Sequence, residues 1–353
     1  MSGRLLAVVV LLIGGGVFAI FQSGLWQSDA PVDTDADSFA EPVADNDPQA
    51  NVEQKIALNL KIGDRFPLLK TVEQTLKQPS TKGDGVSRSR LEMMLSVTLQ
   101  EIYRSPPNQT GKDPREGQKR FQVRYHRVKF SQDVPGNAVE YDSAAPPNPV
   151  PLAAQVYHGL RDNGFEFWIG PDNQILELVG FKPFLERCLQ GVAPAQRQQV
   201  WDMLAAATGA DGIANFVDDS IGVLPASAVR LGETWTSSRN IPQPVPMHVS
   251  SKYTLRQISP QTAEIDVVGT ISPSATYGPA DQPASGVQVT VRGGHCFGSC
   301  VIDRRSGLPV QSKVEQSMDM NVRMSAGLSF DQHKTTVTTI RAFPQDGTQT
   351  AAK

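Results

Sequence analysis

The chain has 353 residues, of which 39% are hydrophobic and 20% are charged, as is usual for a globular protein. Its formal net charge of −3 is unevenly distributed, because no Lys or Arg lies between Arg4 and Lys55 whereas eight acids do. The rest of the chain is mildly basic with scattered charges. This argues against nucleic-acid binding, which needs a concentrated basic face.

An uncharged and almost wholly apolar stretch, residues 5–21, follows Arg4. A short apolar run behind a positive N-terminus is typical of an export signal. As a helix the stretch would be roughly 26 Å long, and extension to Trp26 would bring it to about 33 Å, against a hydrocarbon core of ~30 Å. Residues 1–26 are therefore predicted to be either a cleaved signal peptide or a retained anchor that enters the membrane through residues 5–26.

Residues 27–54 are rich in Asp, Ala and Pro and contain few large apolar side chains. Such a segment cannot bury enough apolar surface to offset the entropy of ordering, so it is predicted to be a disordered acidic linker. Residues 344–353 are predicted to be a disordered tail. Together with the export signal, these features predict a folded body in the periplasm or cell envelope, held at the outer side of the inner membrane.

Strand patterns dominate residues 55–180, the predicted first β-unit. Residues 90–103 alternate apolar and polar side chains, the period of a strand with one buried face. Residues 119–130 repeat the alternation with a slip at His126–Arg127, where a β-bulge is expected. The apolar set of the first strand is expected to line an apolar cavity: Met93, Leu95, Val97 and Leu99.

Residues 181–222 carry the helical signal and form a predicted helical insert. One helix is expected from Pro194 to Gly209, the usual residues at the two ends of a helix. Its apolar stripe, which includes Trp201, faces one side only, so the insert is expected to pack on a sheet.

Residues 223–343, the predicted second β-unit, again read as strands. They include 247–258, 262–271, 286–293, 308–324 and 333–343. The predicted fold is mainly β (α+β), with long curved antiparallel sheets or a partial barrel and the helical insert packed on it. The hexapeptides KIGDRF (61–66) and RLGETW (230–235) match in type, which indicates either two similar β-units or a coincidence.

Two motifs resemble an uncharacterised family of exported bacterial proteins. One is the opening of the second β-unit, Leu231-Gly232-Glu233 with Trp235, and the other is a late hairpin with Gly298, Asp303, Gly307 and Pro309. The similarity spans about residues 55–343, and members are described only as a domain of unknown function. The resemblance therefore implies a β-rich body and no catalytic residues. A looser architectural likeness is to periplasmic lipoprotein carriers, whose curved sheet is closed by helices around an apolar cavity.

The stretch GGHCFGSC, residues 293–300, is chemically the most suggestive. A zinc site would need a second ligand pair, and His295 points away from Cys296 in a strand, so no metal is expected. Two alternatives remain for Cys296 and Cys300. They form a disulfide across a tight turn, as an oxidising compartment allows, or they are two free thiols buried in the sheet. Cys188 is expected to be an unpaired small hydrophobe.

No nucleophile elbow, phosphate-binding loop or cofactor motif occurs in the sequence. Asp218 and Asp219 are adjacent and so point different ways on a helix. Phe165, Phe167 and Trp168 are interpreted as core or as cavity lining. The chain is predicted to be a non-enzymatic cell-envelope protein, without cofactor, that binds a protein partner or an apolar ligand. The alternatives are an assembly component of an envelope complex and an enzyme whose site, near His126 or His158, forms only on folding.

Overall fold

A computed structural model describes residues 7–13, 16–22, 52–80, 83–106, 113–134, 137–171, 173, 175–197, 201, 223–241, 245–275, 287–324 and 327–343.

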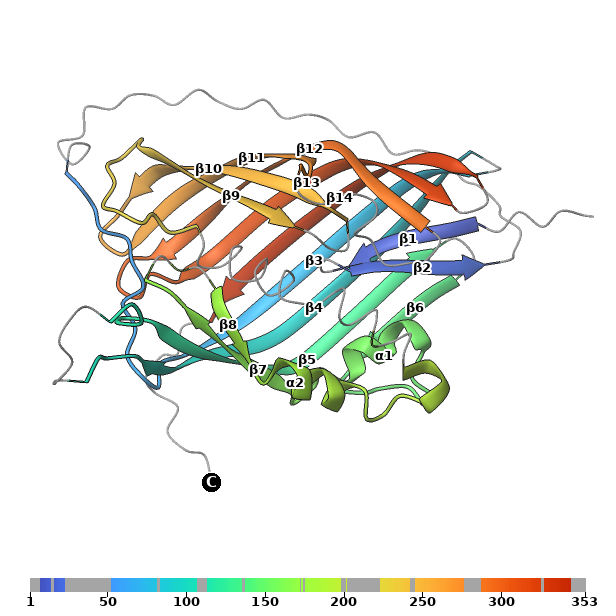
Figure 1. Ribbon diagram of the computed structural model, residues 1–353, viewed down its shortest axis with the longest axis horizontal. Helices are drawn as coiled ribbons and strands as arrows, with labels where there is room; N and C mark the ends of the chain where they lie inside the picture. Colours follow the sequence, from blue (N-terminus) through green and yellow to red (C-terminus); the bar gives the residue numbers. More distant parts are fainter. Residues whose placement is uncertain are drawn as a thin grey trace, which may run out of the picture.

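One antiparallel sheet of twelve strands forms the body, and it curves into an open half-barrel (Figure 1). The strands follow one another in the order β8-β7-β5-β4-β3-β14-β13-β12-β11-β10-β9, and β6 pairs with β5. The first half of the chain supplies β3 (Arg65–Ser80), β4 (Gly83–Ile102), β5 (Lys119–Val134), β6 (Asn137–Asp142), β7 (Gly164–Ile169) and β8 (Ile175–Val179). The second half supplies β9 (Thr234–Ile241), β10 (Met247–Ile258), β11 (Thr262–Pro273), β12 (Val287–Asp303), β13 (Pro309–Met324) and β14 (Ser329–Ala342). The prediction of a mainly β fold with long curved antiparallel strands is confirmed.

Bulges and glycines give the sheet its curvature. The β4–β5 register jumps from Met94↔Arg127 to Leu95↔Tyr125, so His126 is the extra residue of a bulge, as predicted. On the concave face, Gly298 of β12 lies against the backbone of β13, where an added Cβ would be 2.1 Å from the carbonyl oxygen of Lys313. Glycine therefore allows neighbouring strands to approach closely at the inside of the bend.

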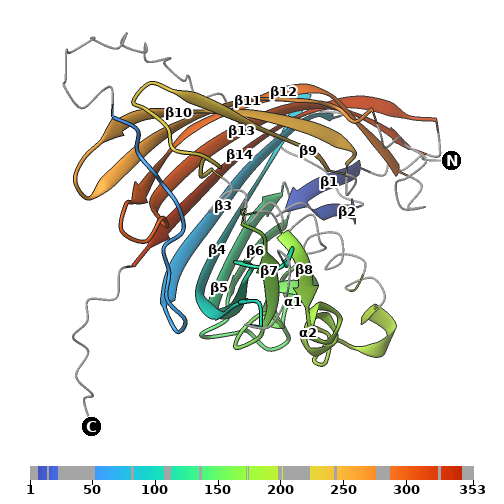
Figure 2. The ribbon, with the colours of Figure 1, turned by 60° about the vertical axis from the view of Figure 1, so that its left-hand side comes forward.

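The apolar N-terminal stretch departs from its prediction. Residues 5–21 were expected to be helical, but the structure has a two-stranded antiparallel hairpin, β1 (Ala7–Ile13) and β2 (Gly16–Gln22). The hairpin lies inside the curve of the sheet, next to β3 (Figures 1 and 2). β-Branched and aromatic residues dominate both strands, and glycines separate them in the sequence, which favours a hairpin over a helix. Among the described residues no helix is long and apolar enough to span a bilayer.

Two short helices pack at the β5–β7 end of the sheet (Figure 2). These are α1 (Leu152–His158), which the sequence did not predict, and α2 (Phe181–Cys188), which opens the predicted helical insert. A 3₁₀ turn follows at Pro194–Gln196, and Trp201 packs against the core. The remainder of the predicted insert, including Asp218 and Asp219, lies outside the described residues.

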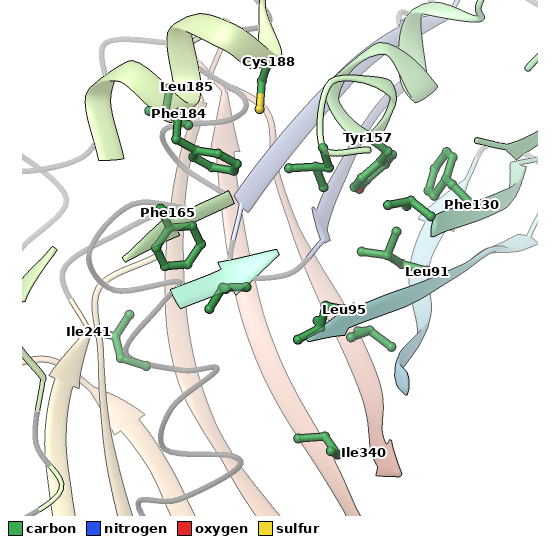
Figure 3. Close-up of a cluster of buried hydrophobic side chains, with 14 of the residues drawn as sticks. Leu91, Leu95, Phe130, Tyr157, Phe165, Phe184, Leu185, Cys188, Ile241 and Ile340 are labelled. Carbon is green, nitrogen blue, oxygen red and sulfur yellow. The ribbon is translucent and has the colours of Figure 1, made fainter. Parts of the chain in front are cut away.

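The main core lies between the concave face and the two helices (Figure 3). Phe184 of α2 packs on Phe165 of β7 with ring centroids 5.3 Å apart, and Tyr157 of α1 packs on Phe130 of β5 at 4.8 Å. Phe165 and Phe167 are thus core residues. Trp168 lies on the opposite, outer face of the sheet, where the guanidinium of Arg120 lies over its ring, 5.7 Å from the centroid.

The two matching hexapeptides fold into the same turn. Gly63 and Gly232 both have positive φ, and each donates its N–H to a strand carbonyl, that of Leu99 at 2.8 Å and that of Leu255 at 2.7 Å. Each turn is closed by an acid that accepts from the N–H three residues before it, Asp64 from Lys61 and Glu233 from Arg230, both at 2.8 Å. The likeness in sequence is therefore a likeness in local structure.

The end of the predicted linker is attached to the body. Gln54 bridges Val229 through backbone hydrogen bonds and accepts a bond from Arg304 at 2.6 Å, while Ile56 is buried. The ordered body thus includes residues 52–54, which were predicted to be disordered linker. Residues 27–51 and 344–353 lie outside the described residues.

Candidate binding site on the concave face of the sheet

The concave face, called the inner face below, carries every second residue of each strand. On β4 it carries the four predicted cavity residues. Leu95 and Leu99 are in the buried core, and Met93 and Val97 are partly buried against it. Met94, the neighbour of Met93, is 45% exposed on the outer face. The prediction that these four side chains share the inward face is confirmed. That they line a cavity stays a prediction, because the cavities described below have other linings.

A row of small and polar side chains crosses this apolar face at right angles to the strands. The strand registers place its members side by side from β9 to β5. We call this row the polar belt, and in spatial order it consists of Ser237, Ser251, Gly269, Cys296, Gln316, Thr336, Gln74, Ser89 and Gln132. Its nine members come from nine different strands, so only the folded sheet assembles it.

Apolar rows flank the belt. On one side the register aligns Val72, Leu91 and Phe130. On the other side the register aligns Met318 and Leu76, with Lys334 between these two apolar residues. A polar strip between apolar rows suits a ligand that has both kinds of surface.

Several amides of this region are buried without a partner. Gln74 and Gln132 are 4% and 5% exposed. Within the described part of the chain, Oε1 of Gln74 accepts no hydrogen bond and Nε2 of Gln132 donates none. Nearby, Gln332 donates from Nε2 to Oε1 of Gln78 at 2.6 Å, but its own Oε1 lacks a donor. Unpaired buried amides cost stability, about 1–3 kcal/mol each, and are rare in native proteins.

The charges of the inner face have one sign. The described strands place Lys70, Lys119, Lys334 and Arg239 there and no Asp or Glu. Lys70, Lys334 and Arg239 each have an interaction within the chain. Burial lowers the pKa of Lys334 from 10.5 to about 7.

A small hollow of about 40 Å³ opens on the inner face at the β9–β13 end of the belt. Ser251, Cys296 and Gln316 of the belt line it together with Arg239 and Tyr253. A second cavity of about 490 Å³ lies beside α2, between Arg124, Asp162, Glu166 and Arg187.

A family model described as a family of unknown function, DUF6263, matches residues 116–309. The chain belongs to this family. The predicted resemblance to a domain of unknown function is therefore confirmed, and the match lies within the predicted span of residues 55–343. The DUF6263 match extends from β5 to the start of β13, so it includes the β5 and β9–β12 parts of the belt.

Solved structures resemble this chain only weakly. An outer membrane channel from Pseudomonas putida F1 is 7% identical, with 83% of this chain and 100% of that chain covered and a TM-score of 0.17. A domain from Vibrio parahaemolyticus described as an outer membrane lipoprotein-sorting protein is 9% identical, with 80% and 87% covered and a TM-score of 0.13. Scores this low carry no argument about function. No curated protein matches the chain in sequence.

The disulfide alternative for Cys296 and Cys300 is wrong. Both are buried cysteines on the inner face of one continuous strand, β12, and neither they nor Cys188 form a disulfide. Residues four apart in a strand are about 13 Å apart, well beyond the reach of a disulfide. The glycine at position 298 serves close strand packing and not a turn. The alternative of two sheet-buried thiols without a disulfide is the one observed.

The residues considered for an enzymatic site form local contacts. His126 Nε2 lies 2.9 Å from Ser96 Oγ, but it also accepts from Arg65 at 3.1 Å. Burial and the charges of Arg65 and Arg124 lower the pKa of His126, so it is a weak base toward Ser96. His158 Nδ1 pairs with the hydroxyl of Tyr141 at 2.8 Å. Among the described residues no group of three His, Cys, Asp or Glu is placed to hold a metal ion.

Replacement of Lys334 by Met is expected to stabilise the protein at low pH. The unfolded chain binds the Lys334 proton up to about pH 10.5, whereas the folded chain releases it near pH 7, so wild-type stability rises with pH between these values. Lys334→Met should raise the free energy of unfolding by roughly 1–3 kcal/mol at pH 6 and by less at pH 9. Urea unfolding at both pH values measures this. A variant that is less stable than wild type at pH 6 would show that the ammonium is held by a favourable ion pair.

Proposed function

We propose that this DUF6263 protein is a non-catalytic cell-envelope protein whose inner face binds the acyl chain of an amphiphile. The observation that carries the proposal is the combination on one concave face of apolar rows, unpaired buried amides and cations without strand carboxylates. A purely apolar core would not contain these groups, because each buried polar group without a partner is destabilising.

The N-terminal sequence supports the proposed location in the cell envelope. The stretch of residues 5–21 has no charge and follows Arg4, as export signals do. We propose that this segment enters the membrane or is removed during export. Because the β1–β2 hairpin lies inside the curve of the sheet, its departure would leave that side of the inner face open to a ligand.

Two adjacent methionines provide a matched test. Met93 lies on the inner face between Lys70 and Val128, and Met94 lies on the outer face. We expect Met93→Gln to weaken binding of the methyl ester of cis-parinaric acid, a neutral fluorescent acyl probe, by about 3- to 10-fold. An amide would then contact the chain in place of a thioether, a difference of about 1 kcal/mol. Met94→Gln should leave binding unchanged.

The measurement is a fluorescence titration of the full chain after detergent removal. All variants keep the same N-terminal apolar segment, so a difference between them reports on the inner face. Equal binding by Met93→Gln and Met94→Gln, or no binding by the wild type, would refute the proposal.

A further inference from the structure

The unpaired amides of the polar belt indicate what kind of headgroup the ligand carries. Gln74 and Gln132 are both more than nine-tenths buried, and Ser89 stands between them in register with each. The free atoms differ in kind, since Oε1 of Gln74 is an acceptor and Nε2 of Gln132 is a donor. A ligand that satisfies both must itself donate and accept hydrogen bonds.

The cations of the inner face indicate the charge of the headgroup. Lys334 of β14 lies on the inner face two residues before Thr336 of the belt, and Leu76 separates it from β4. The strands add Lys70 and Arg239 to the same face and no carboxylate. An anionic group is favoured beside such a surface because its charge is complementary to the face and its oxygens accept charge-assisted hydrogen bonds.

The apolar part of β4 beside the belt is long enough to hold an acyl chain. From Ser89 in the belt to Leu95, β4 advances about 20 Å, and its inner face over this length carries Leu91 and Met93. This exceeds the ~15 Å that one leaflet of hydrocarbon occupies in a bilayer. An acyl chain can therefore lie along β4 while its headgroup occupies the belt.

We infer that the polar belt at Gln74, Ser89 and Gln132 binds the headgroup of an anionic, hydroxyl-bearing amphiphile, of the phosphoglycerol type. Phosphate oxygens accept from Gln132 and Ser89, and a headgroup hydroxyl donates to Gln74. This inference rests on the proposed function, because the belt acts on a ligand whose chain the inner face already holds.

Lysophospholipids with one acyl chain and different headgroups test it by competition. The full chain is loaded with the methyl ester of cis-parinaric acid, which is then displaced by lysophosphatidylglycerol or by lysophosphatidylcholine of equal chain length. The first competitor has a net negative charge and a headgroup with hydroxyl donors, whereas the second is zwitterionic and its choline headgroup has no hydroxyl. Both share the phosphate and the free hydroxyl of the lysoglycerol backbone. We expect lysophosphatidylglycerol to displace the probe at an about 10-fold lower concentration, the equivalent of one charge-assisted hydrogen bond.

Gln74→Leu should reduce this preference to within about 3-fold, because it removes the acceptor of the headgroup hydroxyl, whereas both competitors keep their phosphate contacts. It should also raise the melting temperature of the unliganded protein by about 2–4 °C, because a buried unpaired amide is removed. A merely structural glutamine would lower the melting temperature. Gln311→Leu, an exposed position on the outer face of β13, is the matched control and should keep the full preference.

The outcomes separate the two proposals. Equal displacement by both lysolipids in the wild type overturns headgroup recognition and leaves acyl binding intact. Failure of the probe to bind refutes the proposed function itself. Displacement by glycerol phosphate alone at similar concentration would contradict the amphiphile, because the chain would then contribute nothing.

Discussion

Replacement of Gly298 by Val is expected to destabilise the protein by about 3 kcal/mol or more. A Cβ at this position would be 2.1 Å from the carbonyl oxygen of Lys313 and 2.7 Å from Cα of Val314. Both are backbone atoms of β13, so no side-chain rotation relieves the clash and the two strands must separate. Urea unfolding should show a lower midpoint with the same slope.

Gly293→Val is the matched control in the same strand. No atom lies within 4 Å of a Cβ built at Gly293. Valine also has a higher β-propensity than glycine, so this variant should be neutral or slightly more stable. Similar losses in both variants would show that strand glycines matter here for a reason other than close approach.

Replacement of Phe130 by Ala is expected to cost about 3–5 kcal/mol. The Phe130 side chain is 2% exposed, and its ring contacts Tyr157 of α1 with centroids 4.8 Å apart. Truncation leaves a cavity between β5 and α1 that the curved sheet cannot close. The free energy of unfolding in urea is the measurement.

Phe297→Ala makes the same change on the outer face, where the ring is 38% exposed. We expect a loss below about 1 kcal/mol there, because little apolar surface is buried. If Phe130→Ala cost no more than Phe297→Ala, the helices would not be packed on the sheet as described.

The sequence predicts strands well where one face is uniformly apolar. β4 alternates cleanly from Leu91 to Leu99, and the slip in β5 locates the bulge at His126. β3 is harder to recognise, because its inner face itself alternates between apolar and polar residues, as in Val72, Gln74 and Leu76. The two-residue period is therefore hidden in the very strand that carries the centre of the polar belt.

The belt could not be predicted from the sequence. Gln74, Gln132 and Gln316 meet in one row only because the registers of many strands add up, and a shift of one residue in any strand would move its member to the outer face. The one available signal is a polar residue at a buried phase of a strand. That signal becomes informative only when the pairing is known.

The GGHCFGSC stretch shows how local reasoning can mislead. Glycine beside cysteine favours a turn, and a turn would allow a disulfide between Cys296 and Cys300. The stretch is instead a continuous part of β12, in which Gly298 permits close strand packing and Cys296 belongs to the polar belt. The N-terminal stretch misled in a similar way, because its hydrophobicity suits a helix while its β-branched residues suit the observed hairpin.

The most direct test of the account is to locate the bound acyl chain. A lysophospholipid with a photoreactive group on its chain would be bound to the full-length protein, irradiated, and the adducts mapped by mass spectrometry. We expect adducts on inner-face residues of β4 and β5, with Met93 among them and Met94 unlabelled. Adducts confined to residues 1–26 or to the outer face would contradict the account.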